Sequence, residues 1–144
     1  MKHKALLVTL DGGVARFFER NLPLGILSEI ACIQNDLIDV MPESHHQKPG
    51  RVFESGNTAR HAYDKDEKWR DVQKQKFIQF LVNYLEENYL EYEEIYICCP
   101  AKILGMLREQ LSPRLGAKIT RQYTKDFVKN TIQEISEFID ATPF

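Results

Sequence analysis

Residues 5–19 read ALLVTLDGGVARFFE, which is an apolar run, a short polar break and a second run that contains two phenylalanines. An aspartate followed by glycine between apolar runs is a strong signal for a tight turn, because glycine adopts the positive φ values that hairpin turns need. The stretch therefore predicts a β-hairpin with strands at 5–10 and 14–19. Asp11 is interpreted as a turn residue rather than as a metal-binding carboxylate.

The rest of the chain adds one more strand and then alternates between helices and strands. A third strand is expected at 26–33, and a polar segment at about 42–71 follows it. Apolar residues between Phe77 and Leu85 recur with helical spacing and predict a helix from about Asp66 to Asn88. The remaining expected elements are a strand at 95–99, a helix beginning near Pro100, a strand at 115–123 and a helix with its N-cap at Thr124.

This order, βββ-loop-αβαβα, predicts a single α/β (α+β) domain over residues 1–144, built on a mixed β-sheet. The first three strands should form an antiparallel meander, whereas strands that are joined through helices should run parallel. A chain of 144 residues buries about 68–70% of its unfolded surface, which suffices for one core. No linker or repeat divides the sequence, so the polar segment is interpreted as an excursion within the domain.

Composition excludes several classes of protein. The net charge of −2 argues against a whole-molecule electrostatic grip on nucleic acid, although it allows a local basic patch. The apolar stretch before Asp11 is too short for a signal peptide or a membrane span, so a cytoplasmic protein without membrane association is expected. No dinucleotide fingerprint, P-loop or zinc motif occurs, so neither a cofactor nor a metal is expected.

The three cysteines, Cys32, Cys98 and Cys99, all lie in apolar, strand-like runs. Their odd number and their surroundings favour buried thiols in a reducing compartment over a disulfide framework. The adjacent pair could in principle act in redox chemistry, but an apolar strand raises the pKa of a thiol and suppresses the reactive thiolate. A role in the core is therefore preferred for this pair.

The polar segment at about 42–71 is the main candidate for function. It holds three of the four histidines and several basic residues, and Gly50 and Gly56 interrupt it. Loops of this length inside a small domain are uncommon, and they are usually either functional or disordered. Its scattered apolar residues favour the functional reading. Arg51 and Arg60 are candidate anion-binding residues, because arginines beside glycine-punctuated backbone suit phosphate groups.

Other readings of the segment are weaker. His45, His46 and His61 could hold a metal, but they match no standard ligand spacing, so solvated loop histidines are preferred. Ser55 with Glu54 and His61 could form a nucleophilic triad, although no nucleophile-elbow pattern surrounds the serine. The aromatic residues that could stack on bases, or could instead pack the segment onto the sheet, are Phe53, Tyr63 and Trp69.

A set of short motifs resembles the bacterial host attachment family in order and spacing over nearly the whole chain. These motifs are Asp11-Gly12-Gly13-Val14-Ala15-Arg16-Phe17, Pro49-Gly50-Arg51, Ser55-Gly56, Arg60-His61-Ala62-Tyr63, Phe77, Leu104-Gly105 and Lys125-Asp126. That family is similar to the central domain of archaeo-eukaryotic class 1 peptide-chain release factors and of Pelota-like ribosome rescue factors. The resemblance implies a ribonuclease-H-like or ribosomal-protein-like sheet with a loop before a long helix.

In release factors that loop carries Gly-Gly-Gln, which helps water to cleave peptidyl-tRNA. Here residues 50–60 read GRVFESGNTAR, and Gly-Gly-Gln occurs nowhere in the chain. Asn57 follows a single glycine and has a shorter side chain, so the resemblance does not carry classical peptide release to this protein. What it implies is a loop that approaches RNA, with arginines on phosphates and a histidine that stacks or donates a hydrogen bond. The candidate RNA-binding or anion-binding residues are Arg51, Ser55, Asn57, Arg60 and His61.

Two functions from different classes follow. The first is a cytoplasmic release-factor-like domain at or near the translation machinery, which binds tRNA or rRNA through the 42–71 segment. Whether it also hydrolyses a tRNA ester, and with which residues, is left open by the sequence. The alternative is a non-catalytic module whose loop docks a protein partner and affects attachment to host cells indirectly.

Overall fold

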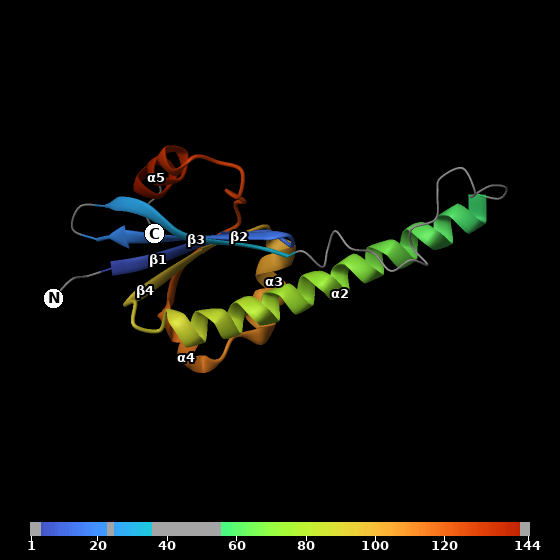
Figure 1. Cartoon of the computed structure of the whole chain (residues 1–144), viewed down its shortest axis with the longest axis horizontal. Helices are drawn as coiled ribbons and strands as arrows, with labels where there is room; N and C mark the ends of the chain where they lie inside the picture. The colour runs from blue at the N-terminus through green and yellow to red at the C-terminus, as the bar shows by residue number, and fades with distance from the viewer. Residues whose placement is uncertain (1–3, 23–24, 36–55, 142–144) are drawn as a thin grey trace.

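A computed structural model of the protein describes residues 4–22, 25–35 and 56–141, with only the backbone described at 56–66. A mixed β-sheet lies between helices on both of its faces (Figure 1). The strands are β1 (Lys4–Leu10), β2 (Val14–Asn21), β3 (Ile26–Gln34), β4 (Glu94–Cys98) and β5 (Ile119–Tyr123). The helices are α2 (Gly56–Asn88), α3 (Ala101–Gln110), α4 (Pro113–Lys118) and α5 (Ile132–Ala141).

The strand order across the sheet is β3-β2-β1-β4-β5. β1, β2 and β3 form an antiparallel meander, while β4 and β5 continue the sheet in parallel on the other side of β1. The mixed α/β sheet predicted from the sequence is confirmed. Since β3 is two antiparallel steps from β1, it runs in the same direction as β1, β4 and β5. All four of these strands therefore end at the same edge, which we call the carboxyl edge.

Asp11 shapes the β1–β2 turn, as predicted. Its Oδ1 atom accepts hydrogen bonds from the backbone N–H groups of Gly13, at 2.7 Å, and Val14, at 2.8 Å. A side chain that caps its own turn fixes the register of the two flanking strands. At Gly12 a Cβ atom would lie 2.5 Å from Cγ of Lys74 in α2, so any larger residue at this position would have to displace the Lys74 side chain.

Two apolar layers cover the sheet, and β1 contributes to both. Leu6, Val8 and Leu10 face the layer formed by α2 and α3, whereas Ala5 and Leu7 face the layer under α5. A strand covered on both faces reads as a continuous apolar run, and this explains the sequence of β1. The helical residues that bury the first layer are Phe77, Ile78, Leu81, Val82, Leu85, Ile103, Leu104 and Leu107.

The long helix and the last strand begin at residues other than those predicted. α2 begins at Gly56 instead of near Asp66, so residues 56–71 of the expected polar loop are helical. The polar, mixed-charge composition of these residues was interpreted as a loop, but the same composition also suits a helix that has no sheet to cover. The strand expected at 115–123 begins at Ile119, because α4 precedes it. Ser112 caps α4 by accepting a hydrogen bond from the backbone N–H of Leu115 at 3.1 Å.

The last helix has its cap at Thr131, so the prediction of Thr124 was wrong. Thr131 and Glu134 form a reciprocal capping box. The Glu134 N–H donates to Thr131 Oγ1 at 3.1 Å, and the Thr131 N–H donates to Glu134 Oε1 at 2.9 Å. Phe127, which was expected on this helix, is buried in the loop that precedes it.

Gly105 provides a test of the packing described above. It lies exposed inside α3, and a Cβ atom there would meet nothing within 4 Å. Because alanine is more favourable than glycine in a helix interior by about 0.8–1 kcal/mol, Gly105→Ala should raise the free energy of unfolding by about that amount. Urea unfolding would measure the gain.

Gly12→Ala is the matched control for this prediction. The same added methyl group must displace the Lys74 side chain, so the free energy of unfolding should fall. Equal effects of the two substitutions would contradict the packing at the β1–β2 turn.

Candidate functional site

The carboxyl edge is the candidate site on topological grounds. The β1–β2 turn, the start of α3 and the β5–α5 loop all leave the sheet there. In open α/β sheets, ligands bind outside the carboxyl ends of the strands, where the chain reverses its direction across the sheet. Here the order in which the strands are added to the sheet changes direction between β1 and β4. β2 and β3 are added on one side of β1, and β4 and β5 on the other.

Asn35 ties the end of β3 to this edge. Its backbone N–H donates to the Gly13 carbonyl at 2.7 Å, and its buried side-chain amide donates to the carbonyls of Gly12 and Gln73, at 3.2 and 3.3 Å. Three elements distant in sequence therefore meet at one amide group. This contact fixes the point on the sheet at which residues 36–55, which the structure does not describe, leave β3.

Helix α2 extends far beyond the sheet at the carboxyl edge (Figure 1). Gln73 is its first buried residue among the side chains that are described. Near this point an ion pair of 2.9 Å between Lys102 and Asp71 joins α2 to α3. Residues 56–72, which we call the arm, correspond to about 25 Å of helix.

The predicted site residues fall partly within this arm. Asn57, Arg60 and His61 lie in its first two turns, although their side chains are not among those described. Arg51 and Ser55 lie outside the described residues, as do His45, His46, Glu54 and Phe53. Among the described side chains, no group of three or more His, Cys, Asp or Glu residues is placed to hold a metal ion.

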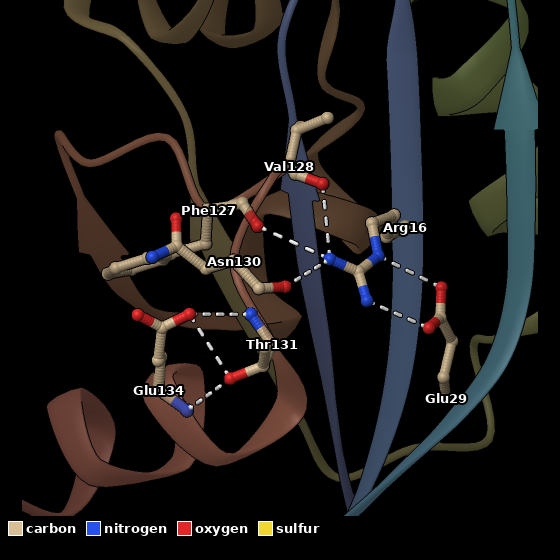
Figure 2. A network of polar contacts seen from close by, with 7 residues as sticks. All are labelled: Arg16, Glu29, Phe127, Val128, Asn130, Thr131 and Glu134. Atoms are coloured by element: carbon tan, nitrogen blue, oxygen red, sulfur yellow. Dashed lines mark hydrogen bonds and ion pairs between the residues drawn. The ribbon is translucent and has the colours of Figure 1, made fainter.

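Arg16 centres a polar network beneath the β5–α5 loop (Figure 2). Its Nε and Nη2 atoms donate to the two carboxylate oxygens of Glu29 on β3, at 3.0 and 2.9 Å. These bonds hold the pKa of Glu29 below its usual value, against the opposing effect of burial. The Nη1 atom donates to three backbone carbonyls of the loop, those of Phe127 at 3.4 Å, Val128 at 3.1 Å and Asn130 at 2.7 Å.

This network gives a structural role to two of the sequence motifs, the one that contains Arg16 and the Lys125-Asp126 pair at the start of the loop. The loop also donates from the Phe127 N–H to Thr9 Oγ1 at 3.0 Å, and Asp126 caps its own turn by accepting from the Val128 N–H at 2.9 Å. Sequence reasoning assigned Arg16 no role of its own, because the loop carbonyls that it binds lie more than a hundred residues away in the chain, and Glu29 lies on another strand.

Comparison with known proteins assigns the chain to a family. The family described as "Protein required for attachment to host cells" matches residues 6–139. The chain belongs to this host attachment family. The matched range includes the Arg16 network, the arm and the carboxyl edge, so the family likeness extends over the entire candidate site.

One relative of this family member is the uncharacterized protein RP470 of Rickettsia prowazekii (strain Madrid E). The two proteins are 22% identical over 99 residues. The matched region covers 66% of each protein, just under two thirds of its length. In the part of the chain that the structure describes, no helix is both long enough and apolar enough to cross a membrane.

The cysteines of the chain divide between core and surface. Cys98 and Cys99 are buried as predicted, and burial raises the pKa of each thiol to about 12. Cys32 is exposed, so its predicted burial was wrong. The reason is that β3 is an edge strand, and neighbouring elements cover the side chains of an edge strand less completely than those of a central strand.

The Arg16 network predicts a pH-dependent loss of stability in Arg16→Gln. The substitution leaves a partly buried carboxylate and three carbonyls without their donor, so the free energy of unfolding at neutral pH should fall by about 2–4 kcal/mol. A lowered pKa in the folded state means that Glu29 adds stability above its ordinary pKa of about 4.3 and loses it as the pH falls. The difference from wild type should therefore narrow in acid.

Arg20→Gln is the matched control for the Arg16 substitution. It breaks a similar pair with Asp140, whose side chain is 55% exposed, so it should cost less than about 1 kcal/mol. Denaturant unfolding between neutral and acidic pH would compare the three proteins. A pH-independent effect of Arg16→Gln would contradict the role given to Glu29.

The thiol environments predict how many cysteines react in the native protein. In dilute native protein, an aromatic disulfide reagent should react rapidly with Cys32 alone, because Cys98 and Cys99 combine burial with a strongly raised pKa. All three thiols should react after unfolding in guanidinium. Rapid release of two or three equivalents from native protein would contradict the core assignment of the adjacent pair.

Proposed function

We propose that this host attachment family member is a cytoplasmic, release-factor-like domain that acts at or near the translation machinery and binds tRNA or rRNA. The arm is the observation that carries the proposal. Beyond the ion pair of Asp71 with α3, about 22 Å of helix continues, and a helix of this length can enter a narrow site that the domain itself cannot enter. The resemblance to release factors concerns this same part of the chain, a loop followed by a long helix.

The sheet supports the finer assignment of fold. An antiparallel meander extended by two parallel strands, with the long helix α2 following the meander in the sequence, agrees with the ribonuclease-H-like arrangement that the resemblance implies. The hydrogen bonds of Asn35 to the carbonyls of Gly12 and Gln73 anchor the base of the arm on the sheet. A rigid base would allow the far end of the arm to be positioned by the domain.

Charge supports a local contact with RNA instead of a broad one. With a net charge of −2, the whole molecule has no general attraction for phosphates. The candidate residues of the arm, Asn57, Arg60 and His61, are spaced at i, i+3 and i+4, and positions with this spacing are neighbours along one face of a helix. Arg51 precedes them by a few residues in the sequence. Arg51 and Arg60 would supply the positive charge for binding to a few phosphates.

Hydrolysis of a tRNA ester is the reaction class that fits this location, and it is a separate question from binding. The absence of Gly-Gly-Gln from the sequence removes the residue that would position water in the manner of release factors. Asn57 is the amide nearest to the corresponding place. Hydrolysis of peptidyl-tRNA should accordingly be measured only after binding has been established.

The alternative function is that of a non-catalytic module that binds a protein through the arm. Val72 favours it, since this apolar side chain is 45% exposed on the outer part of α2. The charges around it alternate in sign, as is typical of a solvent-exposed helix, so Val72 is an apolar side chain on an otherwise polar surface. Protein binding through such a surface would depend little on salt.

Co-sedimentation with bacterial ribosomes and tRNA over a series of salt concentrations tests the first function. Binding should weaken as salt rises, because each phosphate contact releases counterions, and Arg51→Ala/Arg60→Ala should weaken binding and flatten the salt dependence. Arg108→Ala/Arg114→Ala is the matched control, since it also removes two exposed arginines, one near the end of α3 and one in α4, outside the arm. It should bind as wild type does.

The outcomes separate the two functions. No binding at low salt, or equal losses in the two double variants, would refute the RNA-binding proposal. Salt-insensitive binding to a ribosome-free protein fraction, unchanged by both double variants, would support the alternative.

A further inference from the structure

Negative charge gathers at the edge of the sheet opposite the carboxyl edge, where β1, β4 and β5 begin and α2 ends. The glutamates grouped there are Glu19, Glu86, Glu87, Glu91, Glu93 and Glu94. The last turn of α2, which is fully described, contains two of them and no basic residue. Acidic side chains at the C-terminal end of a helix oppose its dipole, so this grouping does not serve the stability of α2. The net charge of −2 therefore conceals an acidic pole at one edge.

The aspartates at the carboxyl edge are all engaged within the domain. Asp11 accepts hydrogen bonds from two N–H groups of its own turn. Asp71 forms the ion pair with Lys102, at 2.9 Å, and Asp126 accepts from the Val128 N–H, also at 2.9 Å. These contacts leave little negative charge at this edge to repel an anion.

Three lysines at the same edge remain available to an anion. Lys125 and Lys129 lie exposed in the β5–α5 loop, and the stem of Lys74 lies against Gly12 at the β1–β2 turn. None of the three forms an ion pair with another residue that the structure describes. Arg16 holds the loop through the Asn130 carbonyl, at 2.7 Å, and so fixes the position from which its lysines extend (Figure 2).

Helix α3 adds to the positive potential of the carboxyl edge, where it begins. Its N-cap residue, Pro100, provides no side-chain hydrogen bond to the N–H groups of the first turn. These groups carry the positive end of the helix dipole. Lys74 and α3 lie on the α2 face of the sheet, and the β5–α5 loop lies on the α5 face. Positive charge is therefore present on both sides of the edge.

We propose that the carboxyl edge is a second RNA-binding surface, on which Lys74, Lys125 and Lys129 bind phosphates of the RNA that the arm contacts. This inference rests on the RNA-binding function proposed above and extends it from the arm to the body of the domain. The base of the arm lies at this edge, so one RNA can reach both surfaces. A chain of phosphates suits lysines that are spread over two faces of a sheet, and the acidic pole disfavours the reverse orientation.

Fluorescence anisotropy with labelled bacterial tRNA over a series of salt concentrations tests the proposal. Lys125→Gln/Lys129→Gln should raise the dissociation constant about tenfold at low salt and reduce the slope of log affinity against log salt by about 0.7 for each lost contact. Lys74→Met keeps most of the stem over Gly12 and should raise the dissociation constant about threefold. Arg114→Gln/Lys118→Gln in α4, at the opposite edge, is the matched control and should bind as wild type does.

The outcomes separate this inference from the function on which it rests. If Arg51→Ala/Arg60→Ala weakens binding but Lys125→Gln/Lys129→Gln does not, the RNA-binding function stands and the second surface is refuted. A wild-type protein that binds no tRNA at low salt refutes both. Equal losses in the loop and α4 variants would indicate a general effect of net charge and overturn the proposal. Binding through these lysines to an RNA-free acidic protein fraction, without binding to tRNA, would also overturn it.

Lysine acetylation gives an independent readout of where the RNA lies. Bound tRNA should slow the reaction of Lys74, Lys125 and Lys129 with an amine-acylating reagent and leave that of Lys118 unchanged, as measured by mass spectrometry. Circular dichroism would confirm that each variant is folded. Protection of lysines in the arm alone would refute a surface on the body of the domain.

Discussion

The fold depends on the burial of β1 from both sides. Its apolar residues alternate between two layers, so that Leu6, Val8 and Leu10 serve the core under α2 and α3, and Ala5 and Leu7 serve the core under α5. β1 is also the strand on which the antiparallel and parallel halves of the sheet meet. Burial of one large side chain stabilises by about 1.5–3 kcal/mol, and a strand that contributes to both layers couples their stabilities. Neither layer can form properly without it.

The limited width of the sheet explains why α2 is only partly packed. The helix covers β1 and β2 with its second half, from Gln73 onward, and its first half then passes the carboxyl edge, where no sheet lies beneath it. A helix segment without an apolar surface to cover is polar all round, as residues 56–72 largely are. The same constraint that builds the core thus leaves an arm available for contact with another molecule. Two contacts hold the base of that arm: the hydrogen bond from Asn35 to the Gln73 carbonyl and the ion pair between Lys102 and Asp71.

Local signals in the sequence were sufficient for the hairpin but insufficient for the helix limits. The turn at Asp11 is encoded by adjacent residues, and it was predicted correctly. Thr131 and Glu134 carry an equally local capping signal, which was passed over in favour of an earlier threonine. At the start of α2, Ser55 is a residue type that often precedes helices, but no apolar periodicity follows it, so the signal was not used. The Arg16 network was beyond sequence reasoning, since the hydrogen bonds join residues that only the fold brings together. Of the candidate RNA-binding residues, Asn57, Arg60 and His61 lie in the part of α2 that the sequence had predicted to be a loop.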